Sequence, residues 1–368
     1  MVKATTLQRV IMQTGMTPIE MAEKLEQQAA SKIDYMAPAS AIKFSVSPTE
    51  TRNTKIVLDR GGRPIVGMPL PNNAEAQLRD FVGMPASYWK RCRSEAPELL
   101  SDNVNHWLRD YEETPRMVRT MDHQCRAILS DRYRALDNVE LFGAVYPILQ
   151  EKGVQIHSAN ISEDYFYLQG FVPSLRKAVK VGDEVELGIT VKNSEVGKGR
   201  LVVNRWVMRL LCTNGMKGQE ILGKTHLGRQ DQIIEADYSI LRDETRELND
   251  QAFWNTVHDV VDANVSEMAL NEEVNKLKEA AEEPIEIEAP KAVEVITQHC
   301  GLSETAGHKI LNNLIKGHDV SRWGYVNAVT AVAHDKDLTF DQNIEMQEAG
   351  AKVLELPQKT WAKLAERV

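Results

Sequence analysis

The sequence is poor in cysteine and has none of the long apolar runs that cross a membrane. Its 368 residues contain four cysteines, Cys92, Cys125, Cys212 and Cys300, with no paired spacing. Scattered cysteines are typical of free thiols in a reducing compartment rather than of a disulfide framework. No stretch approaches the roughly 20 apolar residues that a membrane helix requires. The first residues also lack the apolar core of a signal peptide. We therefore expect a cytoplasmic protein with no membrane partner.

Common motifs of nucleotide hydrolysis and metal catalysis are also missing. The pattern GxxxxGK[ST] does not occur, which argues against a P-loop ATPase. Neither HExxH nor CxxC occurs, and His299, Cys300, His308 and His318 do not have the spacing of zinc ligands. We accordingly predict no metal, no cofactor and no catalytic residue.

The net charge of −9 conceals two segments of opposite sign. Residues 171–230 contain eleven Lys and Arg against five Asp and Glu, a balance of +6. Residues 231–299 contain five Lys and Arg against eighteen Asp and Glu, a balance of −13. Such asymmetry is a known indication of nucleic-acid contact. Two solvated faces of opposite sign within one stable domain would give the same pattern.

Periodicity predicts four segments along the chain. Residues 1–70 are expected to hold a helix capped by Thr17, a linker rich in Pro, Ser and Thr over 34–53, and a hairpin over 55–65. Residues 71–270 are predicted to form an α+β core domain, 271–290 an acidic connector and 291–368 a helical C-terminal region. The core should contain helices over 72–112 and 138–153, a hairpin over 116–130 and four consecutive strands from 154 to 212. The predicted fold class is therefore α+β, with a central antiparallel sheet flanked by helices.

The clearest structural signal is a hairpin that begins at Asp183. Apolar residues alternate with polar or small ones from Val185 to Val191, which predicts a strand with one buried face. Gly197 and Gly199 mark a turn, and the chain returns from Leu201 with Trp206 and Met208 on one face. Arg205 and Arg209 alternate with these apolar residues. We expect the two arginines to occupy the polar side of the strand.

This hairpin and several flanking motifs resemble a known family. The motifs are Asn-Ser at 193–194, Cys-Thr-Asn-Gly at 212–215, Pro-Glu-Leu-Leu-Ser-Asp-Asn-Val-Asn at 97–105, Ser-Asp-Arg-Tyr-Arg at 130–134, Leu-Asp-Asn at 136–138 and Asn-Ala-Val-Thr at 327–330. Together they resemble the YafZ/YfjQ-like proteins of prophages, phages and plasmids, over roughly residues 75 to 350. The resemblance implies a phage or other mobile-element origin, and hence the host cytoplasm. It implies no particular biochemical activity.

Ten cationic residues suggest a nucleic-acid interface. Tyr165, Tyr167 and Phe171 precede the hairpin, and a sheet that mixes cations with aromatic rings suits single-stranded DNA. Cations contact phosphates, and rings stack on bases without sequence preference. We expect the ten residues to form one continuous surface. The alternative is that the rings belong to the core and the arginines pair with nearby carboxylates. The ten are Arg116, Arg119, Arg126, Arg132, Arg134, Lys192, Lys198, Arg200, Arg205 and Arg209.

The Cys-Thr-Asn-Gly motif favours a structural role. Cys212 is in phase with Trp206 on the apolar side of its strand, and buried cysteines are usually unreactive. We therefore expect Cys212 not to be a nucleophile with His226. Thr213, Asn214 and Gly215 are typical of a turn.

Three functions remain open from the sequence. The first is a non-catalytic protein that binds single-stranded DNA in annealing or recombination. The second is an interaction factor that acts on host defence or replication proteins through its acidic helices. The third is a nucleic-acid-processing enzyme that uses Cys212 or a group of Asp131, Arg132 and Arg134. Partners are thus single-stranded DNA or host and phage proteins, and a homo-oligomer is compatible with the sequence.

Overall fold

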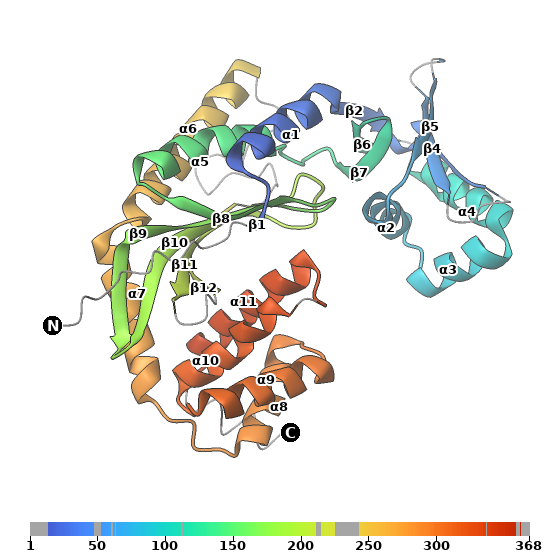
Figure 1. Cartoon of the computed structure of the whole chain (residues 1–368). Coiled ribbons are helices and arrows are strands. Elements are labelled where there is room, and N and C mark those ends of the chain that lie inside the picture. The colour runs from blue at the N-terminus through green and yellow to red at the C-terminus, as the bar shows by residue number, and fades with distance from the viewer. Residues whose placement is uncertain are drawn as a thin grey trace.

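The computed structural model of the chain shows an α+β fold built around one large sheet (Figure 1). Helices cover both faces of this sheet, and a smaller lobe extends from one end of it. The structure describes residues 14–47, 53–59, 62, 64–111, 113–210, 215–224, 243–335, 337–357 and 361.

The large sheet has the strand order β1-β8-β9-β10-β11-β12. Only the short β1 (Thr14–Gly15) is parallel to its neighbour, β8 (Gln155–Ile161). The other strands are antiparallel: β9 (Phe166–Lys180), β10 (Asp183–Asn193), β11 (Leu201–Arg209) and β12 (Gly215–Lys224). The expected hairpin is confirmed as β10 and β11, in which Gly188 pairs with Trp206. Strand β12 was not among the predicted strands.

Both faces of the central strands are buried, which corrects the expectation of one buried face. All residues from Val185 to Val191 and from Leu201 to Met208 are buried. On one face, Ile189 and Val191 pack with α1 (Pro18–Ser31), α5 (Asn138–Glu151) and α6 (Asp243–Asn264). Farther along the same face, Val185 and Leu187 join the core that contains α7 (Glu267–Glu282). On the other face, the indole of Trp206 donates to Gln347 of α11 (Phe340–Glu355).

The close approach of β9 and β10 in the large sheet depends on a glycine. A Cβ on Gly188 would lie 2.0 Å from the carbonyl oxygen of Gly170, which is on the paired strand β9. Gly188 also pairs with Trp206 across the hairpin. The absence of a side chain therefore permits the register of β9, β10 and β11.

The lobe consists of residues 33–130, inserted between α1 and α5. One of its sheets has the order β2-β6-β7 and the other β3-β4-β5. The strands are β2 (Ile33–Pro38), β3 (Ile42–Val46), β4 (Thr54–Asp59), β5 (Pro64–Pro69), β6 (Pro115–Met121) and β7 (Gln124–Ser130). Helices α2 (Asn72–Phe81), α3 (Ala86–Glu95) and α4 (Pro97–Asp110) complete it.

The predicted linker over 34–53 is wrong, because most of its described residues form β2 and β3. Ile42, Phe44 and Val46 are buried and alternate with exposed residues, a strand pattern that the Pro and Ser content obscured. The Thr17 cap is confirmed: its side chain accepts from the Glu20 amide, and the Glu20 carboxylate accepts from the Thr17 amide at 2.7 Å. The predicted helices over 72–112 and hairpin over 116–130 are confirmed too.

The C-terminal helices are α8 (Ala289–Cys300), α9 (Glu304–Gly317), α10 (Arg322–Ala331) and α11. They share a core with α7 through Leu277, Ile296 and Val329. The predicted connector over 271–290 needs correction, because residues 271–282 belong to α7 and bury Val274 and Leu277 against the sheet. None of the described helices is long and apolar enough to span a membrane.

Candidate nucleic-acid interface

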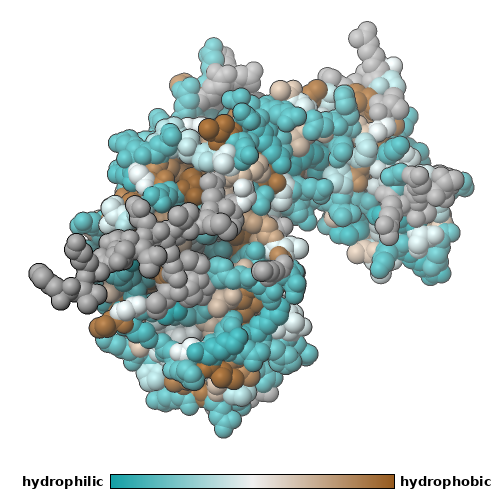
Figure 2. All heavy atoms as spheres, viewed as in Figure 1, coloured by the Kyte–Doolittle hydropathy of each residue, from teal (hydrophilic) through white to brown (hydrophobic). Residues whose placement is uncertain are grey.

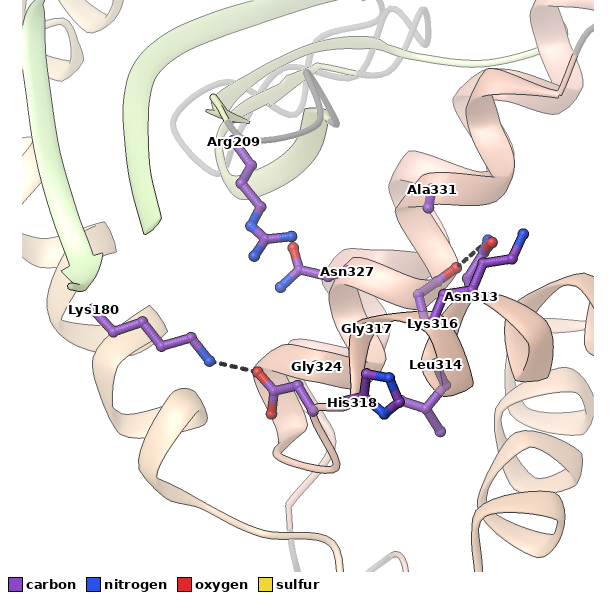
Figure 3. Close-up of a pocket in the computed structure, with 12 residues that line it drawn as sticks. Lys180, Arg209, Asn313, Leu314, Lys316, Gly317, His318, Gly324, Asn327 and Ala331 are labelled. Carbon is purple, nitrogen blue, oxygen red and sulfur yellow. Dashed lines mark hydrogen bonds and ion pairs between the residues drawn. The ribbon is translucent and has the colours of Figure 1, made fainter. Parts of the chain in front are cut away.

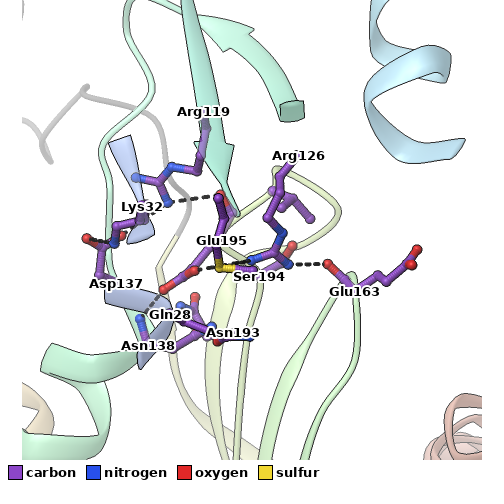
Figure 4. Close-up of polar contacts among 12 residues, drawn as sticks. Gln28, Lys32, Arg119, Arg126, Asp137, Asn138, Glu163, Asn193, Ser194 and Glu195 are labelled. Carbon is purple, nitrogen blue, oxygen red and sulfur yellow. Dashed lines mark hydrogen bonds and ion pairs between the residues drawn. The ribbon is translucent and has the colours of Figure 1, made fainter. Parts of the chain in front are cut away.

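The lobe is joined to the large sheet by a buried charged network centred on Arg119 of β6 (Figure 4). The side chain of Arg119 is only 1% exposed. It donates to both carboxylate oxygens of Asp34, at 2.9 and 2.7 Å, and to Asp137 at 3.1 Å. It also donates to the backbone carbonyl of Glu195, in the turn between β10 and β11. Burial lowers the pKa of Arg119, but the charges of Asp137 and Asp34 raise it by more, so the guanidinium remains charged.

The turn after β10 is bound on several sides by this network. Asn193 donates to the backbone carbonyl of Leu136 and to the side chain of Asn138, both at 2.8 Å. The Glu195 carboxylate accepts from the first amide of α5, that of Asn138. In the lobe, the side chains of Asn73 and Gln77 donate to the carbonyl of Val196. Residues far apart in the sequence are thereby fixed together at the junction.

Motifs that carry the family resemblance meet at this junction. Tyr133, from the Ser-Asp-Arg-Tyr-Arg motif, donates to the carbonyl of Ser194, from the Asn-Ser motif. Arg134 forms an ion pair with Asp250 of α6. Asn138 of the Leu-Asp-Asn motif contacts Asn193. These contacts give the motifs a shared structural role in joining the lobe, α5 and the large sheet.

Five of the ten predicted cations have largely buried side chains that pair with carboxylates, so the ten do not form the continuous surface that we expected. The five are Arg119, Arg126, Arg134, Arg205 and Arg209. Arg126 lies 3.9 Å from Glu195 and donates to the backbone carbonyl of Glu163. Arg116 lies over the ring of Phe81 at 3.7 Å, and burial lowers its pKa. Arg132 is exposed. Of the arginines of residues 116–134, Arg119, Arg126 and Arg134 thus belong to the junction.

Arg205 and Arg209 are not on a solvated side of the sheet, which corrects that expectation. Arg205 contacts Glu272 and the buried Glu273 of α7, at 2.7 and 3.2 Å. Arg209 binds both oxygens of the buried Asp183, at 2.6 and 2.9 Å. The two arginines do alternate with Trp206, but helices cover their face as well. Part of the acidic segment therefore neutralises the basic hairpin inside the fold.

Three predicted cations lie at the end of the sheet where β10 turns into β11. Lys198 and Arg200 are exposed, and Lys192 is half-buried at 3.5 Å from Glu348. Lys192 lies 4.3 Å from the centre of the Tyr165 ring, and the Tyr165 hydroxyl donates to the carbonyl of Lys198. Lys198 and Arg200 have side chains exposed by 41% and 48%. Their carboxylate partners are also accessible: Asp164 at 4.0 Å from Lys198 and Glu220 at 2.7 Å from Arg200. We call Tyr165, Lys192, Lys198 and Arg200 the Tyr165 cluster.

The other two candidate aromatic residues belong to the core, as the alternative interpretation held. Tyr167 is 2% exposed and Phe171 3%. Tyr167 packs edge-on against Phe340 of α11, and Phe171 lies in a small cluster with Trp206 and Met208. Since α11 covers this face of the sheet, a nucleic-acid strand cannot bind to the face there.

Most of the Cys-Thr-Asn-Gly motif lies outside the described residues. Cys212, Thr213 and Asn214 lie outside them, as does His226, so their predicted roles stay predictions. Gly215 begins β12 and pairs with Met208.

Within the described part of the chain, no group of three His, Cys, Asp or Glu side chains could hold a metal ion. Burial raises the pKa of the Cys125 thiol to about 12, so this cysteine is not a nucleophile near neutral pH.

The face of the molecule in Figure 2 is mostly hydrophilic, with scattered apolar residues, and is indented between the lobe and the C-terminal helices.

No protein-family model, curated protein or solved structure matches the chain.

Proposed function

We propose that this protein binds single-stranded DNA at the Tyr165 cluster and acts in annealing or recombination within a mobile element. The observation that carries the proposal is the position of Tyr165, with Lys192 over its ring and its hydroxyl bonded to the loop of Lys198. Cations beside an aromatic ring are the combination that binds an unpaired strand, since phosphates and bases are contacted together. The mobile-element context comes from the family resemblance of the sequence.

The pairing of Lys198 and Arg200 with accessible carboxylates is compatible with this role. Ion pairs in water contribute about 0–1 kcal/mol, so a phosphate can replace the carboxylate at little cost. The buried ion pairs of Arg119 and Arg205 are not replaced so easily, because removing one partner leaves an unpaired charge in the protein interior. We therefore assign DNA contact to the Tyr165 cluster and structural roles to Arg119, Arg134 and Arg205.

The proposal is tested by the anisotropy of a labelled single-stranded oligonucleotide, titrated at several salt concentrations. Each phosphate contact on a single strand adds about −0.7 to the log–log salt slope. The double variant Lys198→Glu/Arg200→Glu should therefore flatten the slope by about 1.4. The matched control Lys90→Glu/Arg91→Glu changes the charge equally, on the exposed side of α3 in the lobe, and should keep the wild-type slope.

Stacking is tested separately at Tyr165. A base stacked on an aromatic ring contributes about 1–3 kcal/mol, so Tyr165→Ala should weaken binding at least fivefold. Tyr165→Phe keeps the ring and should bind within about twofold of wild type. Absence of binding at low salt, or equal losses in the double variant and its lobe control, would refute the proposal and favour a protein partner.

A further inference from the structure

A second site lies at the opposite end of β10, where the hairpin of β9 and β10 meets α9 and α10 (Figure 3). A cavity of about 480 Å³ opens there. This volume is within the range of small-molecule and cofactor pockets. Asp183 begins β10 near the cavity and Asn193 ends it near the Tyr165 cluster. With a rise of about 3.3 Å per residue, the two sites are about 30 Å apart.

The described lining combines cations with an apolar wall. The cations are Lys180, which pairs with Asp319, Arg209, which pairs with Asp183, and Lys316. Leu314, Ala328 and Ala331 contribute apolar or small surface. In Figure 3, Arg209 extends from the end of β11 toward Asn327 on α10. The remaining lining residues are Asn313, Gly317, His318, Asp319, Gly324 and Asn327.

Of these lining residues, one is a carboxylate, and its oxygens already accept several hydrogen bonds. Asp319 accepts from Lys180 at 2.5 Å, and from the amide and the hydroxyl of Ser321 at 3.0 and 2.6 Å. Burial raises the pKa of Asp319, but the Lys180 and Ser321 hydrogen bonds lower it by more, so it remains ionised. Lys316 is exposed, and its ammonium adds positive charge on the α9 side of the cavity.

The shape of the site is held by groups behind it. Asp183, 2% exposed, accepts from Arg209 and from the indole of Trp323 at 2.9 Å, which fixes the Arg209 guanidinium. The loop before α10 approaches the helix so closely that a Cβ on Gly324 would lie 2.0 Å from the carbonyl oxygen of Asp319. His318 has a left-handed backbone, φ 50°, which turns the chain from α9 into this loop. A pre-formed pocket loses little entropy when a ligand binds.

From the volume, the three cations and the apolar wall, we propose that this cavity binds a nucleotide-sized phosphate ester. Its phosphate would contact Lys180 and Arg209 on the sheet side of the cavity, Lys316 would add positive charge from α9, and its base or sugar would pack on Leu314 and Ala328. The site is independent of the proposed DNA contact, because it lies at the other end of the sheet.

The test is isothermal titration of the full chain with AMP, and with adenosine and inorganic phosphate as partial probes. AMP should bind saturably and at least tenfold more tightly than adenosine, because the phosphate meets the cations. Lys316→Glu should weaken AMP binding about tenfold. Lys291→Glu, an equal change at an exposed lysine of α8, should leave it unchanged, as should Lys198→Glu/Arg200→Glu in the Tyr165 cluster.

Three results would overturn the proposal: no saturable AMP binding, adenosine binding as tightly as AMP, or equal weakening by Lys316→Glu and Lys291→Glu. A free nucleotide and the phosphorylated end of a strand share the same chemistry. Displacement of AMP by a 5′-phosphorylated but not by a 5′-hydroxyl oligonucleotide would support the site and identify the strand end as its source. Displacement by neither would support a free nucleotide.

Discussion

The hydroxyl of Tyr133 donates a hydrogen bond of 3.0 Å to the backbone carbonyl of Ser194, although 61 residues separate them in the chain. Both residues are buried. The bond connects the segment that leads from the lobe into α5 with the turn between β10 and β11. Burial raises the pKa of Tyr133 above its ordinary value, which keeps the hydroxyl protonated as a donor.

Tyr133→Phe should therefore destabilise the protein by about 1–3 kcal/mol, because the buried Ser194 carbonyl loses this donor. Urea unfolding measures the change. Tyr146→Phe is the matched control, since the Tyr146 hydroxyl bonds only to the exposed Gln150 side chain among the described contacts. The control should change the free energy of unfolding by less than about 0.5 kcal/mol. Equal effects of the two variants would contradict the role given to Tyr133.

Arg119→Met should cost about 3–5 kcal/mol in unfolding free energy, because Asp34 and Asp137 would lose their buried partner. Arg119→Lys should recover only part of this loss, since an ammonium cannot form the two parallel hydrogen bonds to Asp34. The control Arg91→Met removes an exposed pair with Glu95 and should change stability by less than about 1 kcal/mol. A wild-type denaturation midpoint for Arg119→Met would show that the network is not needed.

Stability should fall at acid pH through Asp137. Burial raises the pKa of this carboxyl, but Arg119 and Lys32 lower it by more, so the net pKa is below 3.8. Because the folded state then binds the proton less readily than the unfolded state, the contribution of Asp137 is complete above about pH 4. The contribution is lost as the pH falls through the folded-state pKa. Urea unfolding of wild type and Asp137→Asn between about pH 5 and pH 2 should give a flatter pH dependence for the variant. Parallel curves of unfolding free energy against pH for the two proteins would show that Asp137 does not cause the loss of stability at acid pH.

Two glycines should respond to alanine in opposite directions. Gly188→Ala places a Cβ 2.0 Å from the Gly170 carbonyl oxygen, and it should destabilise the sheet by more than about 2 kcal/mol. Gly143 lies within α5, and a Cβ added there would meet no described atom of another element within 4 Å. Gly143→Ala should therefore stabilise the protein by about 0.5–1 kcal/mol, as expected for glycine in a helix interior. Thermal unfolding of both variants measures the two changes in stability. A stabilised Gly188→Ala or a destabilised Gly143→Ala would contradict the prediction.

Local patterns in the sequence determined much of the secondary structure. The Thr17–Glu20 capping box, the Ser303 cap of α9, the alternation in β10 and β11 and the period of α5 each depend on neighbouring residues. The sequence also indicated an α+β fold and a basic hairpin. The strands within the predicted linker and β12 were missed because their turn-forming and small residues dilute the period of two.

The positions of the charges were decided only by the tertiary structure. Arg205 and Arg209 alternate with apolar residues on one strand, which in an isolated sheet would place them in water. Helix α7 brings Glu272 and Glu273 to Arg205, from more than 60 residues away. Likewise Asp34, from the segment predicted as a linker, neutralises Arg119 from 85 residues away. Alternation fixes which side of a strand a residue occupies, but only the packing of distant elements determines whether that side meets water, a carboxylate or a ligand.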